Sequence, residues 1–142
     1  KNTVTWTPLN GIKLLEVDKM NEKLTLIVGA TTNRSRYAYF AASRLVGAGV
    51  PFVPIGIKSG EVLGKQIIDL RAKPHLDNIH TITLYVGTAN QSEWIDYLIS
   101  LNPKRIIFNP GTENPVFFQK AKAQGIEVLE ACTLVMLSTN QY

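Results

Sequence analysis

Short apolar runs alternate along this chain with longer segments in which apolar residues recur at helical spacing. A run that is apolar throughout is typical of a strand buried on both faces of a parallel sheet. A weaker strand is expected around Ile67–Leu70, and a last strand opens the apolar segment that begins at Ile126. The clear strands are predicted at 24–29, 51–56, 81–87 and 104–111.

Three segments between these strands predict helices of ~10–14 residues. In the first, Tyr37, Phe40, Ala41, Leu45 and Ala48 recur at helical spacing before Gly49. An asparagine cap opens the second, at 90–101, and the third, at 114–125, has proline near its start and glycine at its end. The polar segment 30–35 supplies turn and N-cap residues before the first helix.

Strands that alternate with helices predict right-handed βαβ crossovers. The expected fold class is therefore α/β, a Rossmann-like, doubly wound parallel sheet of about five strands in three layers. The chain has 142 residues with 45% hydrophobic and 18% charged residues, which fits one globular domain, predicted at 20–142. Residues 1–19 have no strong period, and they are either an extraneous extension or an N-terminal arm that packs on the domain or a neighbour.

Charge and cysteine content exclude several classes of protein. The formal charge of +4 is scattered along the chain, which speaks against nucleic-acid binding. One cysteine and two histidines exclude a disulfide framework and the usual zinc ligand sets. No apolar run approaches the ~18 residues of a membrane span, and no signal peptide is visible. We therefore expect a reduced, cytoplasmic protein.

In an open parallel sheet, ligands bind beyond the carboxyl ends of the strands, at the switch point in strand order. The loop after the first strand, at 29–36, leads into a helix whose dipole and N–H groups can hold a phosphate. Its donors are Thr31, Thr32, Asn33, Ser35, Arg34 and Arg36. Only Gly29 is glycine, so the G-x-G-x-x-G pattern is missing. A capped helix start with solvated arginines is the alternative.

Two later loops bear on the ligand. A domain specific for NAD places an acidic residue after the second strand, whereas this chain has Lys58 there. A lysine suits the extra ribose phosphate of NADP or coenzyme A, and a solvated surface lysine is the alternative. In the loop at 108–115, Pro110 and Gly111 let backbone approach a ligand closely, and Asn114 is placed to cap the next helix.

No catalytic machinery is visible in the sequence. His75 and His80 fall in a weakly patterned region that is predicted to lie on the surface, and no carboxylate pair stands out. Cys132 sits in an apolar run and is predicted to be an inert core thiol. Tyr37, Tyr39 and Phe40 are expected to pack rather than to form a cofactor site.

Several motifs together resemble one family. They are IVGAT–N–R–Y at 27–37, VPIGIK at 53–58, EVLGK at 61–65, LYVG at 84–87, FNPGTEN at 108–114 and A–GIEV–E-C at 121–132. Their order and spacing resemble the stand-alone CoA-binding domains, which are similar to the N-terminal domain of the succinyl-CoA synthetase alpha subunit. The chain differs from many of these relatives at Gly56 and Gly87, where prolines or a Pro-x-Asn-Pro turn are common.

The resemblance implies a set of ligand contacts. The CoA phosphates would meet Gly29, Ala30, Thr31, Thr32, Asn33 and Arg34, the phosphorylated ribose would meet Lys58, and Phe108, Asn109, Pro110 and Gly111 would line the rest of the pocket. It implies binding of coenzyme A or an acyl-CoA without catalysis, with an acyl-CoA enzyme as a possible partner. Two alternatives stay open: an NADP-type dinucleotide binder, and an interaction protein with a lapsed pocket that forms a homodimer through residues 1–19.

Overall fold

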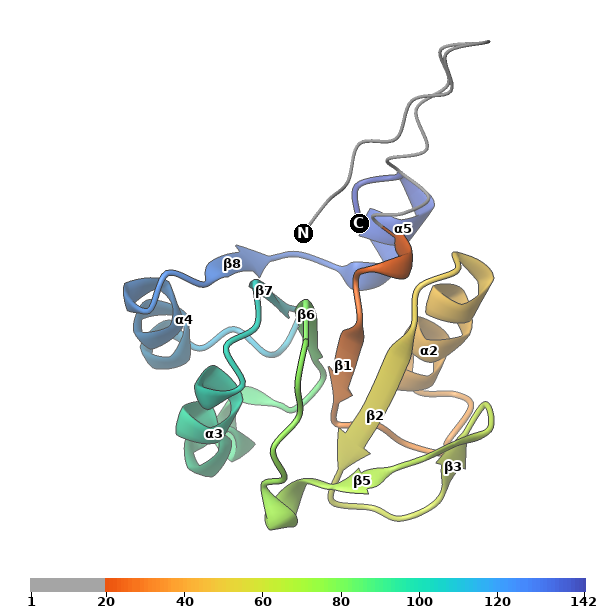
Figure 1. Ribbon diagram of the computed structural model, residues 1–142, viewed down its shortest axis with the longest axis horizontal. Coiled ribbons are helices and arrows are strands. Elements are labelled where there is room, and N and C mark those ends of the chain that lie inside the picture. The colour runs from red at the N-terminus through yellow and green to blue at the C-terminus, as the bar shows by residue number, and fades with distance from the viewer. Residues whose placement is uncertain (1–19) are drawn as a thin grey trace, which may run out of the picture.

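Six parallel strands form the centre of the molecule, with helices on both faces (Figure 1). The computed structural model describes residues 20–142, so the prediction for residues 1–19 lies outside the described residues. The strands of the sheet are β1 (Thr25–Val28), β2 (Phe52–Gly56), β5 (Ile68–Asp69), β6 (Thr81–Leu84), β7 (Arg105–Phe108) and β8 (Glu127–Glu130). A separate antiparallel hairpin joins β3 (Glu61–Val62) and β4 (Lys65–Gln66).

The order of the strands is β5-β2-β1-β6-β7-β8. The chain moves outward from β1 to β2 and β5, and then crosses to the other side of β1 with β6. The switch point therefore lies between β1 and β6, which pair in register from Thr25↔Thr81 to Val28↔Leu84. This topology confirms the predicted Rossmann-like α/β fold, and the short β5 corresponds to the weak strand expected at 67–70.

In residues 20–142, four α-helices cover the sheet: α2 (Tyr37–Gly47), α3 (Ile95–Ser100), α4 (Pro115–Ala123) and α5 (Thr133–Ser138). Three 3₁₀ turns accompany them in this part of the chain, at Leu70–Ala72, Thr88–Asn90 and Ser92–Trp94. Of the segment expected to be a helix, at 90–101, only the part from Ile95 onward is α-helical, and Asn90 does not cap it. None of the helices in the described part is long and apolar enough to cross a membrane.

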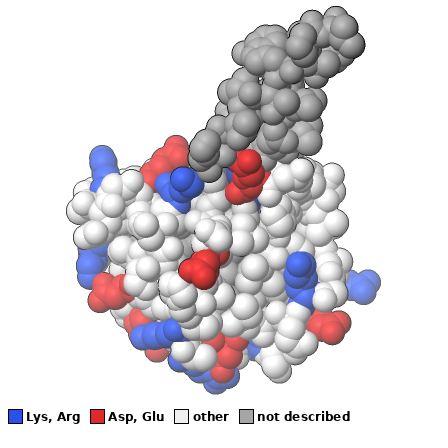
Figure 2. All heavy atoms as spheres, in the orientation of Figure 1, with Lys and Arg blue, Asp and Glu red and all other residues white. Residues whose placement is uncertain are grey.

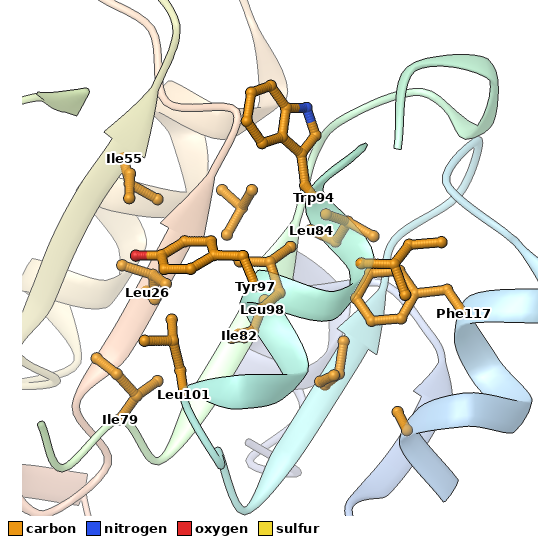
Figure 3. Packing of buried hydrophobic residues seen from close by; sticks show 14 of the residues in the cluster. Leu26, Ile55, Ile79, Ile82, Leu84, Trp94, Tyr97, Leu98, Leu101 and Phe117 are labelled. Atoms are coloured by element: carbon orange, nitrogen blue, oxygen red, sulfur yellow. The ribbon is translucent and has the colours of Figure 1, made fainter. Parts of the chain in front are cut away.

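Side chains of the central strands alternate between two separate cores. Leu26 and Val28 of β1 pack with α3 and α4, whereas Ile27 packs on the opposite face with α2 and α5. Figure 3 shows the first of these cores, where Phe117 of α4 is fully buried. Its ring meets Phe108 edge to face with centroids 5.0 Å apart. Burial on both faces is the reason that these strands are mostly apolar, and the polar residues that they bury, such as Thr25, Thr81 and Arg105, are hydrogen-bonded to one another or to Tyr142.

The C-terminal apolar segment forms a helix that the sequence pattern did not assign. We expected an apolar finish after the last strand, but residues 133–138 form α5, which packs against α2. A short apolar run does not distinguish a buried strand from a helix by its pattern alone. Cys132 lies directly before this helix and is partly exposed, so it is not the core thiol that the sequence predicts.

A polar cluster closes the opposite edge of the sheet, at the amino ends of the strands. Arg105 is 6% exposed, and its Nε donates to Thr81 Oγ1 at 2.7 Å while its guanidinium lies over the Tyr142 ring. The Tyr142 hydroxyl shares a 2.6 Å hydrogen bond with Thr25 Oγ1. His80 is half-buried beside this cluster, with Nδ1 at 2.7 Å from Thr81 Oγ1, so it is not a simple surface histidine.

His80 makes the stability of the domain sensitive to acid. Burial, reinforced by the positive charge of Arg105, lowers the pKa of His80 to about 4, below the ~6.5 of an unfolded histidine. As the pH falls from about 6.5 towards 4, the unfolded chain takes up a proton that the folded chain resists, so the free energy of unfolding falls. We expect this fall to be smaller in His80→Gln when denaturant unfolding is measured between pH 7 and pH 4. Identical pH profiles for the two proteins would contradict this role.

Candidate functional site

A cavity of about 580 Å³ opens at the carboxyl edge of the sheet, beside the switch point between β1 and β6. It is lined by residues of four loops, at 29–38, 57–58, 85–87 and 110–112. In Figure 1 the arrowheads of β1 and β2 point towards this edge. The position is the one that the fold predicts for a ligand.

The loop after β1 begins at Gly29, where the backbone has φ +95°. A Cβ at this position would lie 2.9 Å from the carbonyl carbon and oxygen of Tyr85. The N–H groups of Gly29 and Ala30 both donate to the carbonyl oxygen of Ile55, at 2.9 and 3.1 Å. These two N–H groups therefore hold the loop against β2, and they are not the free phosphate donors that the sequence suggested.

The rest of this loop is an Asn33-centred turn. Asn33 Oδ1 accepts hydrogen bonds from the Ser35 N–H at 3.0 Å and the Ser35 hydroxyl at 2.7 Å. Arg36 occupies the N-cap position of α2, and no side chain caps the helix. The N–H groups in the first turn of α2 therefore have no side-chain acceptor, and together with the helix dipole they favour an anion there.

The loop after β2 packs closely over the first loop. A Cβ on Gly56 would lie 3.0 Å from the Ala30 carbonyl oxygen, and one on Gly60 would lie 2.5 Å from Thr32 Cγ2. Glycine at position 56, where this chain departs from many relatives, is thus explained by the backbone of Ala30 beneath it. Thr32 is engaged in the contact with Gly60 and does not line the cavity.

The eleven residues predicted as ligand contacts divide into two groups, and their roles in binding stay predictions. Those that line the cavity are Gly29, Ala30, Thr31, Asn33, Lys58, Pro110 and Gly111. Thr32 and Arg34 are exposed outside the lining, whereas Phe108 and Asn109 are buried behind it.

Asn109 is a structural residue of the cavity wall. Its side-chain amide donates to Thr83 Oγ1 at 2.8 Å and to the Leu84 carbonyl at 2.9 Å, and its Oδ1 accepts from the Thr133 N–H at 2.9 Å. It is 2% exposed and joins β6, β7 and the start of α5. The nitrogen and the oxygen of this side-chain amide are thus both hydrogen-bonded inside the protein.

Gln91 is likewise a buried structural amide, in the loops after β6 and β7, and its role was not predicted from the sequence. It is 1% exposed, and its Nε2 donates to the carbonyl oxygens of Val86 and Thr112, both at 2.8 Å. Its Oε1 accepts from Asn114 Nδ2 at 2.9 Å. Asn114 in turn caps α4, as predicted, by accepting from the N–H groups of Val116 and Phe117. A glutamine in a polar loop gives no sequence signal of such burial.

Tyr37 and Ile57 line the cavity without having been predicted to do so. The expectation that Tyr37 and Phe40 pack in the core is wrong, because they are 68% and 41% exposed, while Tyr39 does pack against the core. The buried face of α2 is made by its small residues and Leu45 instead. The apolar spacing of this helix is compatible with two faces, and only the sheet contact selects one.

The electrostatics of the cavity favour an anion. Arg36 and Lys58 are its charged lining residues, and no Asp, Glu, His or Cys of the described chain lines it. Burial raises the pKa of Tyr85 to about 12, so this phenol is neutral at physiological pH. No cluster of three His, Cys, Asp or Glu side chains suited to a metal occurs in the described part. On the face shown in Figure 2, positive and negative side chains are interspersed.

Comparisons with known proteins agree with this architecture. A family model described as a CoA binding domain matches residues 23–138, and none of the curated proteins searched matches the chain. A crystal structure of an uncharacterized protein is 49% identical, with a TM-score of 0.82, and the match covers 84% of this chain and 98% of that one. A hypothetical protein from Pyrococcus horikoshii OT3 is 24% identical over 87% of each chain, with a TM-score of 0.72. A Thermus thermophilus protein is 19% identical, covers 89% and 94% of the two chains and has a TM-score of 0.71.

We expect Gly29→Ala to destabilise the domain by at least about 2 kcal/mol, because its positive φ disfavours a side chain and the added methyl meets the Tyr85 backbone. Gly87→Ala is the matched control, since Gly87 has φ −58° and open space around it. Its free energy of unfolding should change by less than about 0.5 kcal/mol. Urea unfolding of both variants checks the prediction, and equal stabilities would overturn it.

Gln91→Leu should lower the free energy of unfolding by about 2 kcal/mol, since it leaves the buried Thr112 carbonyl and the partly buried Val86 carbonyl without this donor. The exposed Gln119 of α4 provides the control, and Gln119→Leu should stay within about 0.5 kcal/mol of the parent. A parent-like Gln91→Leu protein would show that this network contributes little.

Proposed function

This chain belongs to the CoA-binding domain family, and we propose that its cavity binds coenzyme A or an acyl-CoA without catalysing a reaction. One observation carries the proposal: a cavity at the switch point of the sheet has Lys58 and the uncapped start of α2 on its wall. Coenzyme A offers a diphosphate and a ribose 3′-phosphate, which suit these two positive features. The cavity volume of about 580 Å³ is within the usual range for a small-molecule site.

The charges of the lining suggest an orientation for the ligand. Arg36, Lys58 and the start of α2 suit the phosphorylated end. At the other side of the cavity, the Gly111 N–H donates to the Glu113 carboxylate at 2.9 Å, so this loop offers neither a free donor nor a positive charge. Gly87 and Gly111 also leave open space there. The neutral pantetheine arm fits this side better than a phosphate does.

The composition of the lining supports binding rather than chemistry. Acid–base catalysis most often uses His, Asp, Glu or Cys side chains, and none of these lines the cavity in the described part of the chain. We propose that the domain acts as a cytoplasmic sensor of acyl-CoA or as a partner of an acyl-CoA enzyme. Lys58 also suits the ribose 2′-phosphate of NADP, which makes an NADP-type dinucleotide the second candidate ligand.

Calorimetric titration of the ligand-free protein distinguishes these two candidates. We expect saturable heat with a micromolar Kd for CoA, and a Kd at least tenfold weaker for NADPH under the same salt conditions. NADPH binding without CoA binding would replace the proposal by the second candidate. No heat from either ligand would contradict both.

Lys58→Glu should raise the Kd for CoA by about tenfold but that for dephospho-CoA by less than about threefold, because only CoA has the 3′-phosphate. Lys65→Glu makes the same charge change on the neighbouring hairpin, outside the cavity lining, and should change both Kd values by less than about twofold. Equal losses for CoA and dephospho-CoA in Lys58→Glu would count against a contact between Lys58 and the 3′-phosphate.

A further inference from the structure

The first residue of α2 presents an aromatic ring to the cavity. Tyr37 is 68% exposed, although the rest of its helix buries its apolar face against the sheet. It lines the same cavity as Lys58. An aromatic side chain left in water forfeits the stabilisation that its burial would give, so packing of the free protein does not account for this ring.

A second exposed ring on the same helix, that of Phe40, contacts Tyr37. Phe40 lies one turn along α2, and the two centroids are 6.1 Å apart at an interplanar angle of 72°, an edge-to-face contact. Such a contact limits the rotation of the Tyr37 ring, which is still 68% exposed. An aromatic ring that is already fixed loses little conformational entropy when a flat ligand stacks on it.

In the loop after β2, an apolar residue adjoins Lys58. Ile57 is 57% exposed, lines the cavity and directly precedes Lys58 in the chain. The cavity therefore combines an aromatic ring, an aliphatic side chain and a cation around one opening. This is the chemistry of a flat heteroaromatic base attached to a phosphorylated sugar.

We propose that Tyr37 is the stacking surface for the adenine base of CoA, with Ile57 as its aliphatic neighbour and Phe40 as the support of the ring. The proposal rests on the proposed function, because it assigns a base to the cavity that Lys58 equips for a ribose phosphate. A stacking contact recognises the base without hydrogen bonds, so it favours nucleotides over other phosphorylated ligands. Tyr37 is then a specificity-determining residue of this site.

The experiment titrates three probes by calorimetry: CoA, adenosine 3′,5′-bisphosphate, which lacks the pantetheine arm, and 4′-phosphopantetheine, which lacks the adenosine. The variants are Tyr37→Ala, Tyr37→Leu and Tyr37→Phe. Val46→Ala is the control, since Val46 is exposed on the same helix but outside the cavity lining. The exposure of Tyr37 makes all four variants expected to fold, and thermal unfolding checks this.

We expect Tyr37→Ala and Tyr37→Leu to raise the Kd for CoA and for the bisphosphate by about tenfold. The Kd for phosphopantetheine should change by less than twofold, and Tyr37→Phe and Val46→Ala should bind all probes as the parent does. Retained bisphosphate affinity in Tyr37→Ala would overturn the proposal, as would an equal loss for phosphopantetheine. An exposed ring that serves a protein partner gives the first of these results. Failure of the parent protein to bind CoA would instead overturn the proposed function.

Discussion

The close approach of the backbone at the carboxyl ends of β1 and β2 is the constraint on which this structure depends. Gly29 lies against the Tyr85 carbonyl with no room for a methyl group, and Gly56 lies almost as close to the backbone of Ala30. The N–H groups of Gly29 and Ala30 share the Ile55 carbonyl. These contacts join three adjacent strand ends into one rigid edge. The cavity has its shape because the loops that follow begin from that edge.

Buried amides continue this rigidity to the other side of the cavity. Asn109 joins β6 and β7 to the start of α5, and Gln91 joins the loop after β6 to the loop after β7. The nitrogen and oxygen atoms of both side chains are hydrogen-bonded to these neighbouring segments. The loops are therefore held by directional hydrogen bonds rather than by apolar packing. Asn109 and Gln91 are therefore not left for a ligand, and the positive charge offered to an anion comes from Arg36, Lys58 and the start of α2.

The two ends of the parallel strands differ in whether their charged side chains are buried or exposed. At the amino edge, Arg105 is buried with Thr81 and the Tyr142 ring, and the half-buried His80 stays neutral. At the carboxyl edge, the cations are exposed and line a cavity. Buried charge at the first edge is part of the folded structure, whereas the exposed charge at the second is available to an anion. The function proposed here follows from the second edge alone.

The sequence by itself determined the fold class, and it named loops that line the cavity. Strands that are buried on both faces are mostly apolar, and their alternation with helices allows few topologies, so the loops at the carboxyl ends of the strands could be named without coordinates. The helix cap at Asn114 was also predictable, because a cap depends only on residues that are neighbours in the sequence. The tertiary structure alone decided the direction of side chains. Tyr37 faces the cavity because α2 rests on the sheet through its small residues, and Asn109 is buried because three distant elements meet around it. Such roles depend on contacts between segments far apart in the chain, which a local pattern does not contain.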